Sequence, residues 1–258
     1  MRLASETDME VFAVPGLPEV RAGDDIAALI DEQADLQDGD VICVASTIVS
    51  KAEGRAFDRS AFEASQRARA IARRLEGITG DRKDPRFAQA VLEESDELLM
   101  EAPFLLTVTR FGHITVNAGI DRSNVPGGDL LLLPEEPAAS ARAIRESLSA
   151  DVAVVVTDTS GRPFRHGQRA VALGWAGMAA NRDWRGERDR DGRELGVTVQ
   201  SVVDELAGAA NLVTGEGAGG TPVAVVRDWS FGDHDGHDLL FRDAETDFVR
   251  QALRQWSY

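Results

Sequence analysis

The chain has 258 residues and a formal net charge of −16, and 43% of its residues are hydrophobic. This charge argues against nucleic acid and anionic membranes as partners, because both are polyanions. No apolar run approaches the roughly 18 residues that a membrane span needs. The N-terminus lacks the apolar segment of a secretory signal, and the single Cys43 leaves no disulfide to form. We therefore expect a cytoplasmic protein in which Cys43 is a small buried core residue.

The apolar patterns predict strands and helices in an irregular order. In chain order they predict a strand at 9–14, a helix at 23–34, a strand at 40–46, helices at 60–77 and 84–100, strands at 104–109 and 113–119, a helix at 138–150, a strand at 152–159, a helix at 197–213, a strand at 221–228 and a helix at 243–256. Asp24 is the expected N-cap of the first helix, and Ser60 and Glu63 have capping-box spacing in the second. Pro85 stands in the first turn of the third helix, and the tetrapeptide "RFGH" predicts a tight turn between two strands.

The order of the elements and the charge pattern indicate the fold class and the environment. Because strict βαβ repetition is absent, we expect an α+β or mixed α/β fold rather than a doubly wound sheet or a barrel. The charged stretch at 181–194 predicts a surface loop. Acidic residues are spread along the chain, and only two of its 28 basic residues, Lys51 and Lys83, are lysines. Such a composition suits a halophilic protein in a high-salt cytoplasm.

Four segments share polar residues at the end of an apolar strand, interpreted as lying immediately after it, where open sheets usually bind their ligands. In the first, the hydroxyls of Ser46 and Thr47 are followed by the ammonium of Lys51. Hydroxyls and a flexible cation near a strand end can hold phosphate oxygens. The alternative is a solvated lysine in a turn. The rarity of lysine favours the functional interpretation, because the chain uses arginine almost everywhere else.

The second and third segments supply candidate metal ligands. Asp121 and Asn124 follow a predicted strand, although an ordinary loop with an Asx-turn is the more common explanation for this segment taken alone. Asp158 and Thr159 end another predicted strand, ahead of a turn with two arginines. A carboxylate and a hydroxyl beside a cationic turn suit a hard divalent cation that holds a nucleotide phosphate.

The fourth segment, "VTGEGAGGTPVAVV" at 213–226, contains a formal G-x-G-x-x-G match. A dinucleotide-binding turn follows a strand and opens a helix, whereas this segment follows a helix and leads into a strand, so that interpretation is rejected. A Walker A loop is excluded as well, because no Lys-Ser/Thr pair follows the glycines. The backbone N–H groups of such a loop can still hold phosphates, and Glu216 suits a metal carboxylate.

The acidic run "DHDGHD" at 233–238 superficially resembles a zinc site through His234 and His237. Histidines this close together in an acidic loop are more often solvated. A zinc hydrolase that uses these histidines is nevertheless kept as a rival hypothesis. A second rival is a nucleotide-binding regulatory protein without catalysis, although binding alone rarely needs the three carboxylates Asp121, Asp158 and Glu216.

Nearly the whole chain resembles the coenzyme F420-0:L-glutamate ligase family in its stand-alone archaeal form. The resemblance is carried by "GLPEVRAGDD", "DGDVICVASTIVSKAEGR", "VLEESDELL", "VNAGIDRSNV", "VVVTDTSGRPFRHG", "GRELGVTVQSVVDELAGAANLVTGEG" and "TPVAVVRD". It implies a family-specific α+β fold in one domain over residues 1–258. This domain would have two lobes and would form an intertwined homodimer. The sequence does not place the boundary between the lobes, and both a continuous and a discontinuous arrangement stay open.

The resemblance also implies the reaction. GTP would phosphorylate the terminal carboxylate of F420-0, and the amine of L-glutamate would then displace phosphate from the acyl phosphate. One glutamate is added, a second through a γ-linkage is a further possibility, and GDP and phosphate are released. Two Mg²⁺ or Mn²⁺ ions per site and K⁺ would assist. The closest alternative is a ligase of the same machinery that joins a different carboxylate and amino acid.

Matching positions carry the family's site residues onto this sequence. The metals would be held by Asp121 with Asp158 and by Thr159 with Glu216, and the three carboxylates would be the catalytic residues. The residues implied to contact GTP are Leu17, Pro18, Glu19, Val20, Ser46, Thr47, Lys51, Asn124, Thr214, Gly215, Glu216, Gly217, Ala218, Gly219, Gly220 and Thr221.

Overall fold

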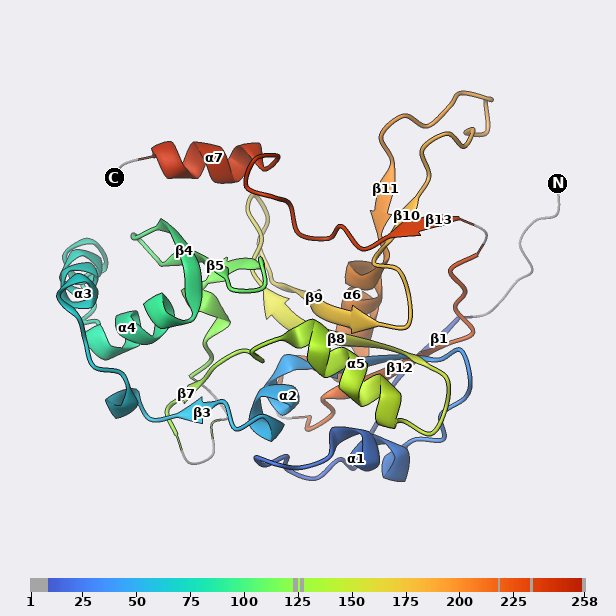
Figure 1. Cartoon of the computed structure of the whole chain (residues 1–258), viewed down its shortest axis with the longest axis horizontal. Helices are drawn as coiled ribbons and strands as arrows, with labels where there is room; N and C mark the ends of the chain where they lie inside the picture. The colour runs from blue at the N-terminus through green and yellow to red at the C-terminus, as the bar shows by residue number, and fades with distance from the viewer. Residues whose placement is uncertain (1–8, 123–124, 126–127, 218, 233, 257–258) are drawn as a thin grey trace. The chain divides into compact units, whose positions relative to one another are not determined.

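The computed structural model describes residues 9–122, 125, 128–217, 219–232 and 234–256, and these form a mixed α+β chain, as predicted (Figure 1). The helices are α1 (Ile26–Gln33), α2 (Ser46–Ala52), α3 (Gln66–Thr79), α4 (Pro85–Glu93), α5 (Pro137–Ser147), α6 (Val202–Thr214) and α7 (Phe248–Gln255), with 3₁₀ turns η1 (Arg59–Ala61) and η2 (Asn117–Gly119). The strands are β1 (Glu10–Ala13), β2 (Val41–Ala45), β3 (Ala56–Phe57), β4 (Ser95–Met100), β5 (Leu106–Thr109), β6 (Ile114–Val116), β7 (Leu130–Leu131), β8 (Ala153–Ser160), β9 (Arg169–Ala176), β10 (Asn181–Asp183), β11 (Val199–Ser201), β12 (Val223–Arg227) and β13 (Asp235–His237).

The chain divides into two compact units, each assembled from separate stretches of sequence. Within the described residues, unit 1 contains the chain up to Ala52, Glu136–Thr159 and Gln168–Leu240. Unit 2 contains Glu53–Glu135, Ser160–Gly167 and the chain from Phe241 onward. Each unit has its own hydrophobic core.

Unit 1 is built on a mixed sheet with strand order β1-β12-β2-β8-β9. Both β1 and β2 pair antiparallel with β12, and β2 pairs parallel with β8. Successive strand residues point to opposite faces. One core cluster therefore joins α1, α2 and α5 to Ile42, Val44, Val154, Val156, Val223 and Val225. The other joins α6 to Val41, Cys43, Ala153, Val155, Ala224 and Val226. The sheet is thus the middle of three layers, which explains why its strands read as unbroken apolar runs.

Cys43 lies in the second of these clusters and is 2% exposed. Burial raises the pKa of its thiol to about 12. A thiol held in the neutral form is a poor nucleophile. The prediction that Cys43 is a core residue is therefore confirmed.

A second, three-stranded sheet of unit 1 has the order β11-β10-β13. Its middle strand β10 opens the 181–194 stretch, which was wrongly predicted to be a loop throughout. The local pattern did not indicate β10, because its residues are polar and its partner β13 lies far away in the sequence. The strand is covered by aromatic rings instead: the guanidinium carbon of Arg182 is 5.2 to 5.6 Å from the ring centres of Trp184, Trp229 and Phe231.

Unit 2 contains an antiparallel sheet of order β4-β5-β6 and the short pair β3–β7. Helices α3 and α4 contribute Ala68, Ile71 and Val91 to its core. The "RFGH" turn is confirmed, since the Thr109 N–H donates to the carbonyl of His113 over 2.8 Å between β5 and β6. Helix α7 is tied to β4 because Arg250 and Arg254 both pair with Glu97. The hydrogen bond from Arg254 is the main reason why the pKa of Glu97 falls to about 2.

Several predicted helix boundaries were wrong. Helix α3 begins after the N-cap Ser65 rather than at Ser60, because Asp58 caps the separate turn η1. The N-cap of α1 is Asp25, whereas Asp24 accepts from the backbone N–H of Arg21. Such shifts follow from competing local side-chain hydrogen bonds, which residue spacing alone does not rank.

Tertiary pairing also replaced predicted secondary structure. The helix predicted at 84–100 ends at Glu93, and Ser95–Met100 pairs with β5 as strand β4. Conversely, Lys51, for which a loop was the alternative, lies near the C-terminal end of the short helix α2. Strand β9 at Arg169–Ala176 was not predicted at all.

The end of the sheet at which β2 begins is closed by a buried ion pair. Asp40 is 2% exposed, and its two carboxylate oxygens accept from Nε and Nη2 of Arg227 over 2.9 and 2.7 Å. Burial alone would raise the pKa of Asp40, but hydrogen bonds from Arg227 and from the Gln37 N–H hold it below its ordinary value of 3.8.

Asp40→Ala should destabilise the protein by roughly 3 kcal/mol, because it leaves the charge of Arg227 without its buried partner. Urea unfolding at fixed salt measures the change. Asp35→Ala removes the same charge from an exposed side chain and should cost less than about 0.5 kcal/mol. Since folding lowers the pKa of Asp40, the difference from wild type should be full above about pH 4 and shrink as the pH falls through the lowered folded-state value. Equal stability of the two variants at neutral pH would contradict the assignment.

Candidate active site

One edge of the unit 1 sheet gathers four segments that are distant in sequence. Strands β1 and β2 end at this edge and β12 begins there, with Ala13 opposite Ala224 and Val44 opposite Val223. Residue 45 of β2 is opposite Thr157 of the parallel strand β8, so the chain that follows each strand continues at the same edge. The segments 17–20, 46–51 and 158–159 and the described residues 214–217 and 219–221 therefore meet there. Carboxyl ends of neighbouring strands are the usual ligand-binding edge of an open α/β sheet.

Ser46 and Asp158 are in direct contact at this edge. The hydroxyl of Ser46, which is 2% exposed, donates to Oδ1 of Asp158 over 2.9 Å. A hydroxyl has one proton, so in this arrangement Ser46 has none left to donate to a phosphate, although its oxygen can still accept or coordinate. Ser46 was predicted as a GTP contact, and the structure adds an interaction with the neighbouring carboxylate.

Thr159 and Glu216 are brought together as well. The hydroxyl of Thr159, near the end of β8, donates to Oε1 of Glu216 over 2.9 Å. The side-chain amide of Asn211, in the last turn of α6, donates to the same oxygen over 2.8 Å. Two residues predicted to share a metal thus contact each other across 57 positions of sequence. Asn211 was not predicted, and the only signal for it was its place one turn before the glycine-rich loop.

The glycine-rich loop between α6 and β12 has a fixed entry. Gly215 adopts φ 69° and ψ −178°, a region of backbone space that is essentially open to glycine only. Its N–H donates to the carbonyl of Asn211, and the hydroxyl of Thr221 donates to the carbonyl of Thr214 over 3.2 Å, which ties the two ends of the loop together. Gly217, Gly219 and Gly220 are exposed. Ala218, also predicted to contact GTP, lies outside the described residues.

The 17–20 segment is anchored to unit 1 and carries a partner for Lys51. Val20 is 3% exposed and Leu17 packs against the α1–α5 core cluster, whereas Pro18 and Glu19 are exposed. The ammonium of Lys51 lies 2.5 Å from Oε1 of Glu19, and its side chain is only 11% exposed. Lys51 is therefore not a freely solvated lysine. It is held by Glu19 and lies on the same helix as Ser46 and Thr47.

Asp121 belongs to unit 2, where its backbone pairs with Leu131 through two hydrogen bonds of 2.9 Å. Its Oδ1 accepts from the Arg122 N–H over 2.6 Å. Asn124 lies outside the described residues. Within the described ranges, no group of three or more histidine, cysteine, aspartate or glutamate side chains is arranged to hold a metal ion. The convergence of Asp121 with Asp158 and Glu216 stays a prediction.

The two histidines of the 233–238 run have separate partners. Nδ1 of His234 lies 2.7 Å from Oε1 of Glu187, and its ring centre is 4.1 Å from that of Trp184. His237, in β13, is 3.5 Å from the side-chain amide of Asn181. In the part of the chain that the structure describes, these contacts account for both rings without a metal. The zinc hypothesis gains no support.

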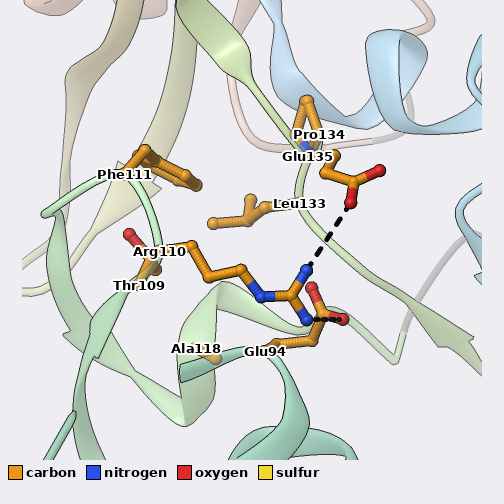
Figure 2. A pocket seen from close by; sticks show the side chains of 8 residues that line it. All are labelled: Glu94, Thr109, Arg110, Phe111, Ala118, Leu133, Pro134 and Glu135. Atoms are coloured by element: carbon orange, nitrogen blue, oxygen red, sulfur yellow. Dashed lines mark hydrogen bonds and ion pairs between the residues drawn. The ribbon is translucent and has the colours of Figure 1, made fainter. Parts of the chain in front are cut away.

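A small pocket in unit 2 lies around Arg110, between Phe111, Leu133 and Pro134 (Figure 2). The guanidinium of Arg110 lies 3.5 Å from Glu94 and 3.7 Å from Glu135. The cavity has a volume of about 10 Å³, which is room for roughly one water molecule. It is too small for a nucleotide or for a substrate with several rings.

No helix among the described residues is long and apolar enough to cross a membrane.

A mixed sheet that gathers carboxylate, hydroxyl and ammonium groups with a glycine-rich loop at one edge is typical of enzymes that handle phosphorylated ligands. A family model described as F420-0:Gamma-glutamyl ligase matches residues 16–228. The chain therefore belongs to this family, as its motifs predicted.

Relatives of the same description cover nearly the full chain. The chain is 74% identical over 250 residues to the coenzyme F420:L-glutamate ligase of Halorubrum lacusprofundi, with 97% of this chain and 99% of the relative covered. It is 73% identical to the ligase of that name from Natronomonas pharaonis, with 97% and 98% covered. The ligase of that name from Archaeoglobus fulgidus is 45% identical over 251 residues, with 96% and 98% covered.

Proposed function

We propose that this chain is a coenzyme F420-0:L-glutamate ligase that uses GTP to join L-glutamate to F420-0. The observation that carries the proposal is the 74% identity, over 97% of the chain, to a relative of that name. The sheet edge of unit 1 supports it, because Ser46, Lys51, Asp158 and Glu216 lie there with chemistry suited to phosphoryl transfer.

The proposed reaction solves the problem that a carboxylate is a poor electrophile at neutral pH. An oxygen of the F420-0 carboxylate attacks the γ-phosphorus of GTP, and the bond to the β-phosphate breaks as GDP leaves. The neutral amine of glutamate then attacks the carbonyl carbon of the acyl phosphate. The bond from that carbon to the phosphate oxygen breaks, inorganic phosphate leaves, and the amine nitrogen gives up a proton to form the amide.

The residues of the sheet edge take distinct roles in this proposal. Lys51 and the N–H groups of the 214–221 loop bind phosphate oxygens. The hydroxyl of Ser46 holds Asp158, and that of Thr159 holds Glu216. Because a hydroxyl that donates its proton keeps its lone pairs, Ser46 and Thr159 can also face a cation.

The donor set at this edge fits a hard divalent cation, because carboxylate and hydroxyl oxygens are the ligands that Mg²⁺ and Mn²⁺ prefer. Asp158 would hold one ion, and Thr159 with Glu216 the other. Bound metal would neutralise the repulsion between the substrate carboxylate and the γ-phosphate. Asp121, assigned to the first ion by family resemblance, completes the set. We further propose K⁺ as an activator, a homodimer as the working form, and addition of a second glutamate through a γ-linkage.

The function is tested by incubating the protein with GTP, Mn²⁺, L-glutamate and F420-0 and measuring the product mass. We expect the mass of F420-0 plus one glutamate, with one GDP released per amide bond formed. A reaction without glutamate should give no amide. Product formation with another carboxylate and amino acid, but not with this pair, would favour a ligase of the same machinery with different substrates. Binding of GTP without any substrate-dependent GDP release would indicate a regulatory protein.

Lys51→Ala should weaken GTP binding at least tenfold, because a charge-assisted hydrogen bond contributes about 1.5–3 kcal/mol. Lys51→Arg should restore only part of the affinity, because a planar guanidinium does not fit a place built for a compact ammonium. Isothermal titration with GTP measures both.

Lys83→Ala is the matched control for Lys51→Ala, since it removes the only other lysine, which lies 3.8 Å from Asp81 on the surface of unit 2. Its GTP affinity should equal that of the wild type. Equal affinities of the Lys51 and Lys83 variants would remove Lys51 from the nucleotide site.

A further inference from the structure

The carboxylate of Glu216 stands on an exposed loop but has a fixed partner on a helix. Glu216 itself is exposed, so packing does not hold its side chain in one rotamer. Its Oε1 instead accepts two hydrogen bonds, from the amide of Asn211 over 2.8 Å and from the hydroxyl of Thr159 over 2.9 Å. Both donors converge on the same oxygen.

Asn211 acts on this loop twice. Its backbone carbonyl accepts from the N–H of Gly215, which sets where helix α6 ends and the loop begins. Its side-chain amide then reaches forward five positions to Glu216. Unlike Thr159, an amide nitrogen has no lone pair to offer a cation, so Asn211 is a donor only at this contact. A residue that touches the carboxylate in this way orients it without competing for the metal.

We propose that Asn211 is a positioning residue that orients Glu216 as a metal ligand, an inference that rests on the proposed function. Asn211 fixes Oε1 of Glu216 and leaves the carboxylate its other oxygen for the cation. Partners of this kind around metal ligands typically account for 10- to 100-fold in metal affinity. The ligand of this site is a divalent cation, which the carboxylate oxygen of Glu216 binds.

The test is a Mn²⁺ binding isotherm, read as free Mn²⁺ by electron paramagnetic resonance, without nucleotide or turnover. Four proteins are compared: wild type, Asn211→Ala, Glu216→Gln and the double variant. Asn211→Ala should weaken the Glu216-dependent site at least tenfold. In the Glu216→Gln background the same change should have no further effect, because a residue that acts through Glu216 has nothing left to orient.

Leu212→Ala serves as the control, since Leu212 neighbours Asn211 on α6 and is 87% exposed. Its isotherm should match that of the wild type, and the metal-free thermal midpoints of the Asn211 and Leu212 variants should agree. Asn211→Leu keeps the branched shape of the side chain without the donor, and it should lose metal affinity to the same extent. It replaces Asn211→Ala in the test if the alanine variant folds poorly.

Each outcome has a distinct meaning. Unchanged Mn²⁺ affinity in a folded Asn211 variant would overturn the inference and leave the proposed function standing. A loss of the same size in the Glu216→Gln background would also overturn it, because Asn211 would then act independently of Glu216. A wild-type protein that binds no Mn²⁺ would instead count against the metal-dependent function itself, and the inference would fall with it.

Discussion

Asp158→Asn should abolish turnover, with kcat reduced roughly a thousandfold or more, while the fold stays intact. The substitution keeps the size of the side chain but removes the charge that a divalent cation needs. Loss of one preorganised electrostatic group at a reacting centre typically costs 10²–10³ in rate, and loss of a metal ligand adds to this. The measurement is F420-0-dependent formation of GDP and of the glutamate adduct at saturating Mn²⁺.

Local geometry explains why the fold should survive this change. The hydroxyl of Ser46 donates to Oδ1 of Asp158, and the amide oxygen of asparagine can accept the same bond. Asp151→Asn is the matched control, because the side chain of Asp151 is 80% exposed and forms an ion pair with Arg145 on the surface of unit 1. It should keep wild-type activity. Near-normal activity of Asp158→Asn at saturating Mn²⁺ would refute the metal assignment.

Glu216→Gln should lower kcat at least a hundredfold and remove one Mn²⁺ from the binding isotherm. Glutamine has the shape of glutamate and can still accept the hydrogen bonds from Thr159 and Asn211 through its amide oxygen. The loop should therefore keep its conformation, and GTP affinity without metal should change little. The loss then reports the missing charge rather than a rearranged loop.

Glu205→Gln provides the comparison for this variant, since Glu205 is exposed in the first turn of α6. It should behave as wild type in both assays. Full activity of Glu216→Gln would contradict the metal assignment, and the hydrogen bonds of Glu216 would then only stabilise the loop conformation.

Much of the site's location was predictable from the strands. The apolar runs of β2, β8 and β12 are unbroken because both faces of the sheet are covered, so their ends were easy to find. Ser46, Asp158 and Thr159 follow or finish such runs, and the carboxyl-end rule placed them at one edge. Their contacts, Ser46 with Asp158 and Thr159 with Glu216, follow from that edge.

The remaining features depend on contacts between distant residues. Strand β9 has three alanines and one glycine among its eight residues. The glycine is required because α5 lies against it: a Cβ at Gly174 would be 2.3 Å from the backbone of Pro137. Its sequence has only one of the β-branched residues by which strands are recognised, Val171. Asn211 reads as an ordinary helical residue until the following loop folds back and brings Glu216 to it. Asp121 belongs to the other unit, and its pairing with Asp158 is implied by the family resemblance.

The ion pair of Asp40 and Arg227 allows the stability of the protein to be changed without changing the candidate site. Asp40 precedes β2 and Ser46 follows it, so a five-residue strand, roughly 16 Å long, separates the ion pair from the candidate site. A variant weakened at Asp40 would keep the ligand groups in place while its folded population becomes sensitive to anything that binds them, by thermodynamic linkage. The rise in the melting temperature of such a variant on addition of a ligand would therefore rank nucleotides, metals and substrate analogues by affinity, without requiring turnover.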